Sequence, residues 1–127
     1  MEYFDRDGKY NFIDENDVVV GYDNCQDCCE WANWFISEER FPDKADEALV
    51  GVVPEDLENW IFDPRGFKEG KSNFENDDTN HYVSFRLLDK KTNKKVAYLI
   101  LFNVHNGYYA HGFTMEVGGL LKQSGDL

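Results

Sequence analysis

The chain has 127 residues and a formal net charge of -12, with 25 acidic side chains against 13 lysines and arginines. A chain of this length with 42% hydrophobic residues can bury one core, which excludes a multidomain protein and a disordered chain. Proteins that bind phosphate backbones draw most of their non-specific affinity from lysine and arginine. The composition therefore argues against direct nucleic-acid binding.

The sequence also lacks the features of a membrane or secreted protein. No stretch approaches 18 consecutive apolar residues, and Met1 is followed by the charged run Glu2–Asp7 rather than by a basic and then apolar signal. We therefore expect no membrane association and a cytoplasmic location.

The acidity belongs to the first half of the chain. Residues 1–64 carry 18 acids and 4 bases, whereas residues 65–127 carry 7 acids and 9 bases. If the first half folds onto the more basic second half, one side of the molecule should carry a strong negative potential that attracts a cationic partner. The plain alternative is that the acids keep a small domain soluble.

The N-terminal half predicts a hairpin followed by a further strand. Residues 10–13 and 18–22 flank the polar turn at residues 14–17, a pattern typical of two paired strands. Residues 28–36 form a compact apolar run that is too short to separate helix from strand by periodicity, and we interpret it as a strand.

Residues 54–64 predict a short helix. Pro54 stands at a favourable first helical position, acids follow it, and Leu57, Trp60 and Ile61 repeat at helical spacing. Asp63-Pro64 would end this helix. The polar residues 65–80 would then form a long loop.

The C-terminal half predicts a three-stranded antiparallel meander over residues 80–117. Residues 96–104 are almost continuously apolar, and Asn106-Gly107 follows, the dipeptide that best accepts the two positive φ angles of a type I′ hairpin. This turn would pair residues 96–104 with residues 108–117. Residues 81–88 alternate between apolar and polar side chains and would form the third strand.

The register of this meander follows from its turns. A two-residue loop would set Phe102 opposite His111 and Ile100 opposite Phe113. The third strand would place its apolar side chains on the same face. The residues sharing that face would be Val83, Phe85, Leu87, Tyr98, Ile100 and Phe102. The opposite face carries smaller side chains, which a helix or the N-terminal segment could cover.

Together these elements predict one domain over residues 1–127 of the α+β class. The expected architecture is a mainly antiparallel sheet of about five strands with one or two short helices, in the two-layer arrangement by which small domains bury a core.

Cysteines form the densest group of potential metal ligands, at Cys25, Cys28 and Cys29. A zinc site would need two histidines as well, but the predicted register separates His81 and His111 by about 12 Å. We therefore expect no metal and no cofactor. The acidic neighbours of the cysteines raise a thiol pKa and so disfavour a cysteine nucleophile.

His111 offers the other candidate site. The expected fold surrounds it with the aromatic side chains of Tyr98, Tyr109 and Phe113, which could form a pocket with one titratable group. A histidine on an apolar face without a catalytic partner is more often part of a satisfied core. We therefore expect that the protein is not an enzyme, and we name no catalytic residue.

Acidic residues recur between residues 37 and 63. Carboxylates at this spacing imitate a row of phosphates or form strong charge-assisted hydrogen bonds with arginine and lysine. The candidate partner-binding residues are Glu38, Glu39, Asp43, Asp46, Glu47, Glu55, Asp56 and Glu58.

Three motifs can be compared with known sequences: Val20–Asp23, Asp27–Glu30 followed by Trp34–Ser37, and Asn106–Phe113. Their combination resembles a group of small, uncharacterised bacterial and phage-borne proteins, and the resemblance covers most of the chain. It implies a compact β-rich accessory protein encoded on a mobile element, and it implies no site residue. By analogy, small acidic proteins in that setting are often inhibitors, such as immunity proteins against basic nuclease toxins or anti-defence proteins of the anti-CRISPR type.

The sequence thus supports two hypotheses. The first is a small acidic inhibitor that uses the acids between residues 37 and 63 to block a basic surface on a nucleic-acid-binding or nuclease protein. The alternative is a ligand- or metal-binding protein that uses the aromatic pocket at His111 or the Cys25/Cys28/Cys29 cluster.

Overall fold

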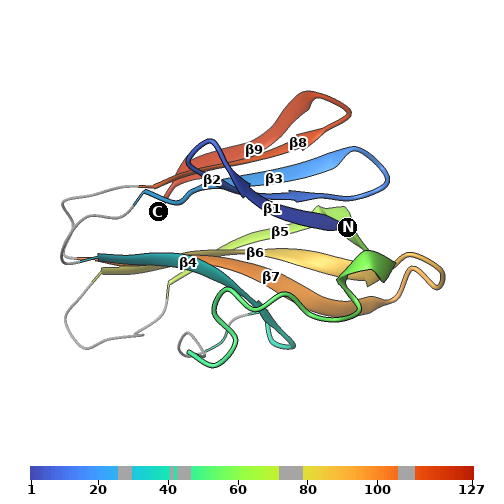
Figure 1. Cartoon of the computed structure of the whole chain (residues 1–127), viewed down its shortest axis with the longest axis horizontal. Coiled ribbons are helices and arrows are strands. Elements are labelled where there is room, and N and C mark those ends of the chain that lie inside the picture. Colours follow the sequence, from blue (N-terminus) through green and yellow to red (C-terminus); the bar gives the residue numbers. More distant parts are fainter. Residues whose placement is uncertain (26–29, 41, 43–46, 72–78, 106–110) are drawn as a thin grey trace.

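A computed structural model describes residues 1–25, 30–40, 42, 47–71, 79–105 and 111–127. Within these residues the chain forms nine β-strands in two antiparallel sheets that pack face to face (Figure 1). Sheet A has the strand order β1-β2-β3-β8-β9, and sheet B has the order β4-β7-β6-β5. The strands are β1 (Glu2–Arg6), β2 (Lys9–Ile13), β3 (Val18–Asp23), β4 (Glu30–Ser37), β5 (Trp60–Lys71), β6 (Thr79–Asp89), β7 (Lys95–His105), β8 (Gly112–Val117) and β9 (Leu120–Asp126).

The prediction of an α+β fold with about five strands and one or two short helices is wrong, because the described residues contain no α-helix and form a five-stranded and a four-stranded sheet. The segment expected to be helical forms a single turn of 3-10 helix, η1 (Leu57–Asn59), and β5 begins at Trp60. Three apolar residues at helical spacing are too few to offset the cost of helix nucleation. The aromatic and β-branched run from Trp60 to Phe62 instead pairs with β6, and Asp63-Pro64 lies inside β5 at a register shift.

The loop expected over residues 65–80 is also wrong in part. Residues 65–71 belong to β5, and residues 79–80 belong to β6, while residues 72–78 lie outside the described residues. The strand predictions in the N-terminal half are confirmed. β2 and β3 form the expected hairpin, and β4 covers residues 30–36 of the apolar run predicted as a strand, whose residues 28 and 29 lie outside the described residues.

The predicted meander is half correct. β6 pairs with β7 as expected, but β7 takes β4 as its second neighbour, whereas β8 pairs with β3 in sheet A. The hairpin between β7 and β8 is therefore wrong, and Phe113 lies opposite Tyr22 rather than Ile100. Asn106-Gly107 lies outside the described residues.

The predicted register between β6 and β7 is also wrong, by one residue. Val83 lies opposite Leu101, Phe85 opposite Leu99 and Leu87 opposite Ala97, with a register shift after Leu87. A one-residue change moves each side chain to the other face of the sheet. The sequence could not exclude this alternative, because β7 is apolar on both faces and either register buries apolar side chains.

The main core lies between the two sheets. Trp34 of β4 is fully buried there, with its ring 4.8 Å from the Tyr3 ring and 5.0 Å from the Phe12 ring. Sheet B also buries its opposite side, which faces away from sheet A. The apolar residues of this outer cluster are Phe35, Tyr82, Ile100, Phe102 and Val104, with Trp31, Val50 and Tyr98 packed against them.

Asp14 joins the two sheets through a buried carboxylate. One carboxylate oxygen accepts hydrogen bonds from the backbone amides of Asn16 (2.9 Å) and Val18 (3.0 Å) within the β2–β3 turn. The other accepts the amide of Phe62 in β5 at 2.8 Å. The β2–β3 turn of sheet A therefore fixes the position of β5, an edge strand of sheet B.

Replacing this carboxylate should destabilise the protein strongly. We expect Asp14→Ala to lower the free energy of unfolding in urea by about 4 kcal/mol, because two of the three abandoned amides are buried. Asp14→Asn, which keeps one acceptor oxygen, should lose less. The exposed neighbour Glu15 is the control, and Glu15→Ala should change stability by less than about 0.5 kcal/mol. Equal stability of Asp14→Ala and Glu15→Ala would contradict the role of Asp14.

The close approach of β5 and β6 requires a glycine at position 66. A Cβ atom there would lie 2.4 Å from the Cβ of Arg86 and 3.2 Å from its backbone nitrogen. Gly66→Ala should therefore lower stability by about 2 kcal/mol in the same assay. Gly112→Ala, whose added Cβ would meet nothing closer than 3.5 Å, is the matched control and should be nearly neutral. Equal unfolding free energies of Gly66→Ala and Gly112→Ala would contradict this close approach of β5 and β6.

Candidate functional site: an acidic strap across sheet B

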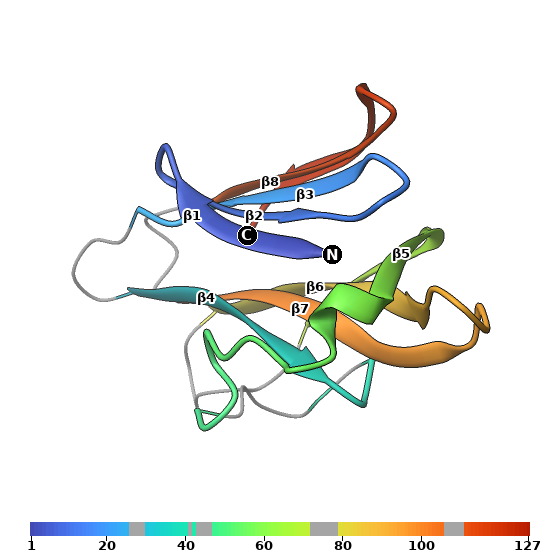
Figure 2. The same ribbon diagram turned by 45° about the vertical axis from the view of Figure 1, so that its right-hand side comes forward.

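Residues 38–59, here called the strap, connect β4 to β5. These two strands form opposite edges of sheet B, so the connection must pass across the sheet. It does so on the side that faces away from sheet A, over the outer cluster (Figures 1 and 2). Residues 41 and 43–46 of the strap lie outside the described residues.

Apolar and backbone contacts hold the strap against the sheet. Val50 packs on the outer cluster, and the amide of Gly51 donates a 2.9 Å hydrogen bond to the carbonyl of Trp34 on the edge strand β4. Pro42 and Leu57 are buried on either side of this contact. The strap is therefore a fixed layer of the structure over the residues described.

Arg40 ties the strap to the far edge of sheet B. Its Nη2 donates a 3.0 Å hydrogen bond to the carbonyl of Gly66 in β5, and its guanidinium carbon lies 4.9 Å from the centre of the Tyr98 ring. Burial raises the pKa of Tyr98, but hydrogen bonds from Arg40 and Arg86, together with nearby positive charge, outweigh burial and hold this pKa below its usual value. The pKa of Tyr98 therefore reports whether Arg40 is in place.

The acids predicted to form the binding face lie on this strap. The six that the structure describes are all exposed: Glu38, Glu39, Glu47, Glu55, Asp56 and Glu58. Asp43 and Asp46 lie outside the described residues. Among the residues described, the ion pairs within 4.0 Å are Arg86–Asp63 and His111–Asp23, and neither involves an acid of the strap. The charge of these six carboxylates is therefore available to a partner.

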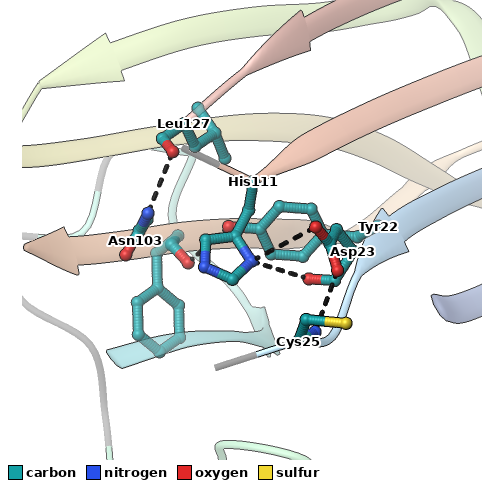
Figure 3. A network of polar contacts seen from close by, with 7 residues as sticks. Tyr22, Asp23, Cys25, Asn103, His111 and Leu127 are labelled. Atoms are coloured by element: carbon teal, nitrogen blue, oxygen red, sulfur yellow. Dashed lines mark hydrogen bonds and ion pairs between the residues drawn. The ribbon is translucent and has the colours of Figure 1, made fainter. Parts of the chain in front are cut away.

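His111 is buried at the opposite end of β8 from the β8–β9 turn. Its Nδ1 lies 3.2 Å from the backbone oxygen of Asp23 and 3.8 Å from the Asp23 carboxylate (Figure 3). Its backbone exchanges two 2.9 Å hydrogen bonds with Leu127, whose carbonyl also accepts a hydrogen bond from Asn103. These contacts fix the position of the chain at this end of the sandwich.

The structure places Tyr98 apart from His111, although both were predicted to line one pocket. Phe113 points into the core between the sheets, whereas Tyr98 packs on the outer side of sheet B. Tyr109 lies outside the described residues. One aromatic ring that packs beside His111 belongs to Tyr22, with the ring centres 6.2 Å apart.

Two hollows border residues that contact His111, Leu127 in one and Asp23 in the other. A cavity of about 450 Å³ is bordered by Glu69, His81 and Phe113, and a groove of about 590 Å³ crosses small residues of sheet A, including Gly21 and Gly112. His111 borders neither hollow.

Of the cysteines, the structure describes Cys25, which is exposed; Cys28 and Cys29 lie outside the described residues. The Cys25 amide donates a 2.9 Å hydrogen bond to the Asp23 carboxylate, while its sulfur points away from the His111 ring in Figure 3. Within the described residues, no group of three or more histidine, cysteine or acidic side chains is arranged to hold a metal ion.

Sequence reasoning located the acids but missed the residues that support them. Arg40 is a cation within an acidic segment, and Val50 is an apolar residue followed by a glycine, Gly51. Both are visible signals of contact with the fold. Neither indicates the partner, because Gly66 and Trp34 lie on strands whose pairing the sequence did not reveal.

Comparison with known proteins identified no relative. No family model, no curated protein and no solved structure matches the chain. The resemblance to phage-borne proteins remains a prediction, and a functional proposal depends on the geometry described above.

Removing Arg40 should loosen the strap. We expect Arg40→Ala to raise the pKa of Tyr98, because burial persists while a hydrogen bond and a positive charge are lost. NMR titration of ¹³C-labelled tyrosine measures this pKa, and amide hydrogen exchange at residues 47–53 should quicken in the same variant. Arg65→Ala, at an exposed arginine of β5, is the control. Unchanged titration and unchanged exchange in Arg40→Ala would contradict the anchoring role.

Proposed function

We propose that the protein is a small acidic inhibitor that binds a basic, nucleic-acid-binding surface of another protein through the strap. The observation that carries this proposal is the state of the six described strap acids, which are exposed and have no basic partner within the described residues. A carboxylate that is not engaged internally keeps its full attraction for an external cation.

The anchoring of the strap favours recognition by this surface. Arg40 and Gly51 hold the strap at opposite edges of sheet B, so the carboxylates next to these anchors are presented on a fixed backbone. Binding then orders fewer chain torsions than binding by a flexible acidic tail, and less of the interaction energy is lost as conformational entropy.

The expected partner is a protein that handles nucleic acid. Such proteins concentrate lysine and arginine where they contact phosphates, and carboxylates in series can occupy the same cations. The net charge of -12 adds long-range attraction to a basic target. We propose that the inhibitor acts in the cytoplasm, where such targets work. The described part of the chain has no helix of the length and apolarity needed to span a membrane.

The test compares two variants that carry the same change in net charge. The strap variant is E38Q/E39Q/E47Q/E55Q, and the control variant D7N/E69Q/E116Q/D126N removes four carboxylates from other parts of the surface. Tagged wild-type protein should capture a nucleic-acid-binding protein from a lysate of its host at low salt and release it at high salt. The control variant should capture it as well.

The rate of association with the captured protein then tests the proposal. The strap variant should associate about 10-fold more slowly at low salt, and the difference should shrink as salt is added. Wild-type protein should also displace nucleic acid from the captured target. Equal association rates for the strap and control variants would refute the proposal.

A further inference from the structure

An exposed group of large apolar side chains interrupts the acids of the strap. Leu49 is 40% exposed, Val52 is 51% exposed and Val53 is 46% exposed. We call these three residues the apolar knob. Single exposed apolar residues are ordinary on protein surfaces, but several together on one short turn often mark a contact with another molecule.

The backbone holds the knob in this exposed position. The amide of Val52 donates a 3.1 Å hydrogen bond to the carbonyl of Leu49, and Gly51 between them has φ +70°, a combination typical of a type II turn. The Gly51 amide is also bonded to Trp34, while Val50 packs on the outer cluster. Because Val50 points to the sheet, its neighbours in the turn are directed outward.

Acidic residues flank the knob on both sides in the chain. Glu47 precedes it by two residues, and Glu55 and Asp56 follow Val53 within three residues, all of them exposed. An apolar centre with a charged margin is the usual composition of a protein-binding patch. The charge of that margin selects a partner whose own apolar patch is bordered by lysine or arginine.

We propose that the knob packs against the apolar face of a basic amphipathic helix on the partner protein. This inference rests on the proposed function and specifies its chemistry: the carboxylates bind the cations of the helix, and the knob covers the apolar stripe between them. A membrane is the less suitable surface, because the cytoplasmic leaflet is anionic and repels the acidic margin.

A second exposed apolar pair provides the matched control. Leu120 is 76% exposed and Leu121 is 62% exposed, at the start of β9 in sheet A. Lys122 follows them in the chain and Glu116 lies opposite Leu121 in β8, so charges of both signs border this pair, unlike the knob with its acidic neighbours. The variant V52S/V53S therefore tests the knob, and L120S/L121S tests exposed apolar surface in general.

The probe is a synthetic helical peptide in which leucines form one face and lysines the other, labelled for fluorescence anisotropy. A second peptide has serine in place of each leucine and the same charge. Wild-type protein and L120S/L121S should bind the leucine peptide alike and the serine peptide more weakly. V52S/V53S should lose roughly 10-fold or more in affinity for the leucine peptide at both low and high salt.

The outcomes separate this inference from the proposed function. Equal binding of the leucine peptide by V52S/V53S and wild type, equal binding of the two peptides, or no binding of the leucine peptide would each overturn the role of the knob. Failure of the proposed function is seen separately, as unchanged association of the captured target with the strap variant.

Binding of wild type but not V52S/V53S to phosphatidylcholine vesicles, without binding to the leucine peptide, would instead assign the knob to a membrane. All variants should keep the urea midpoint of the wild type, because the substituted residues are exposed.

Discussion

The carboxylate of Asp14 is the contact on which the arrangement of the two sheets depends at one end of the molecule. It accepts hydrogen bonds from two amides of the β2–β3 turn and from one amide of β5. The same carboxylate thus binds its own turn and the edge strand 48 residues away. A buried carboxylate is costly unless hydrogen bonds compensate its lost hydration, and three backbone donors supply them here. Because this contact fixes where β5 runs, it also fixes where the strap ends.

The strap follows from the composition of sheet B. The sheet is apolar on both faces, since β7 places Leu99 and Leu101 toward sheet A and Ile100 and Phe102 away from it. Sheet A covers the first face, and the connection from β4 to β5 covers part of the second (Figure 2). The side of this connection that contacts the sheet buries apolar side chains, and the other side is exposed to solvent. We therefore expect apolar residues on the first side and charged residues on the second. The strap has this composition, with Val50 inward and its acids outward.

The sequence predicted local elements well and long-range pairing poorly. The β2–β3 hairpin was predictable because polar residues 14–17 separate two runs rich in apolar residues. The helix at Leu57 and Trp60 was a wrong prediction, since a few apolar residues fit either period and the pairing of Trp60 and Ile61 with β6 decided the outcome. The sequence did not reveal that β7 and β8 lie in different sheets, because the local turn preference of Asn106-Gly107 favours a hairpin and carries no information on the long-range partners β4 and β3.

The same contrast holds for the candidate site. The acids of the strap were predictable from charge alone, and the described ones are exposed, because a carboxylate without a buried partner stays in water. The grouping of Tyr98 with His111 was not realised, because it depended on pairing β7 with β8, and these strands lie in different sheets. The partners of the anchors Arg40 and Gly51 could not be predicted. Arg40 binds the carbonyl of Gly66 in β5, and Gly51 binds the carbonyl of Trp34 in β4, and the sequence did not show that these strands form the two edges of sheet B.

The central claim is that the strap is the surface that meets a basic protein. Amide hydrogen exchange of the protein, measured alone and in complex with the protein it captures, tests this claim most directly. The account predicts that slowed exchange concentrates at residues 38–40 and 47–59. Protection confined to the outer face of sheet A, or to the end of the sandwich around His111, with the strap unchanged, would contradict it.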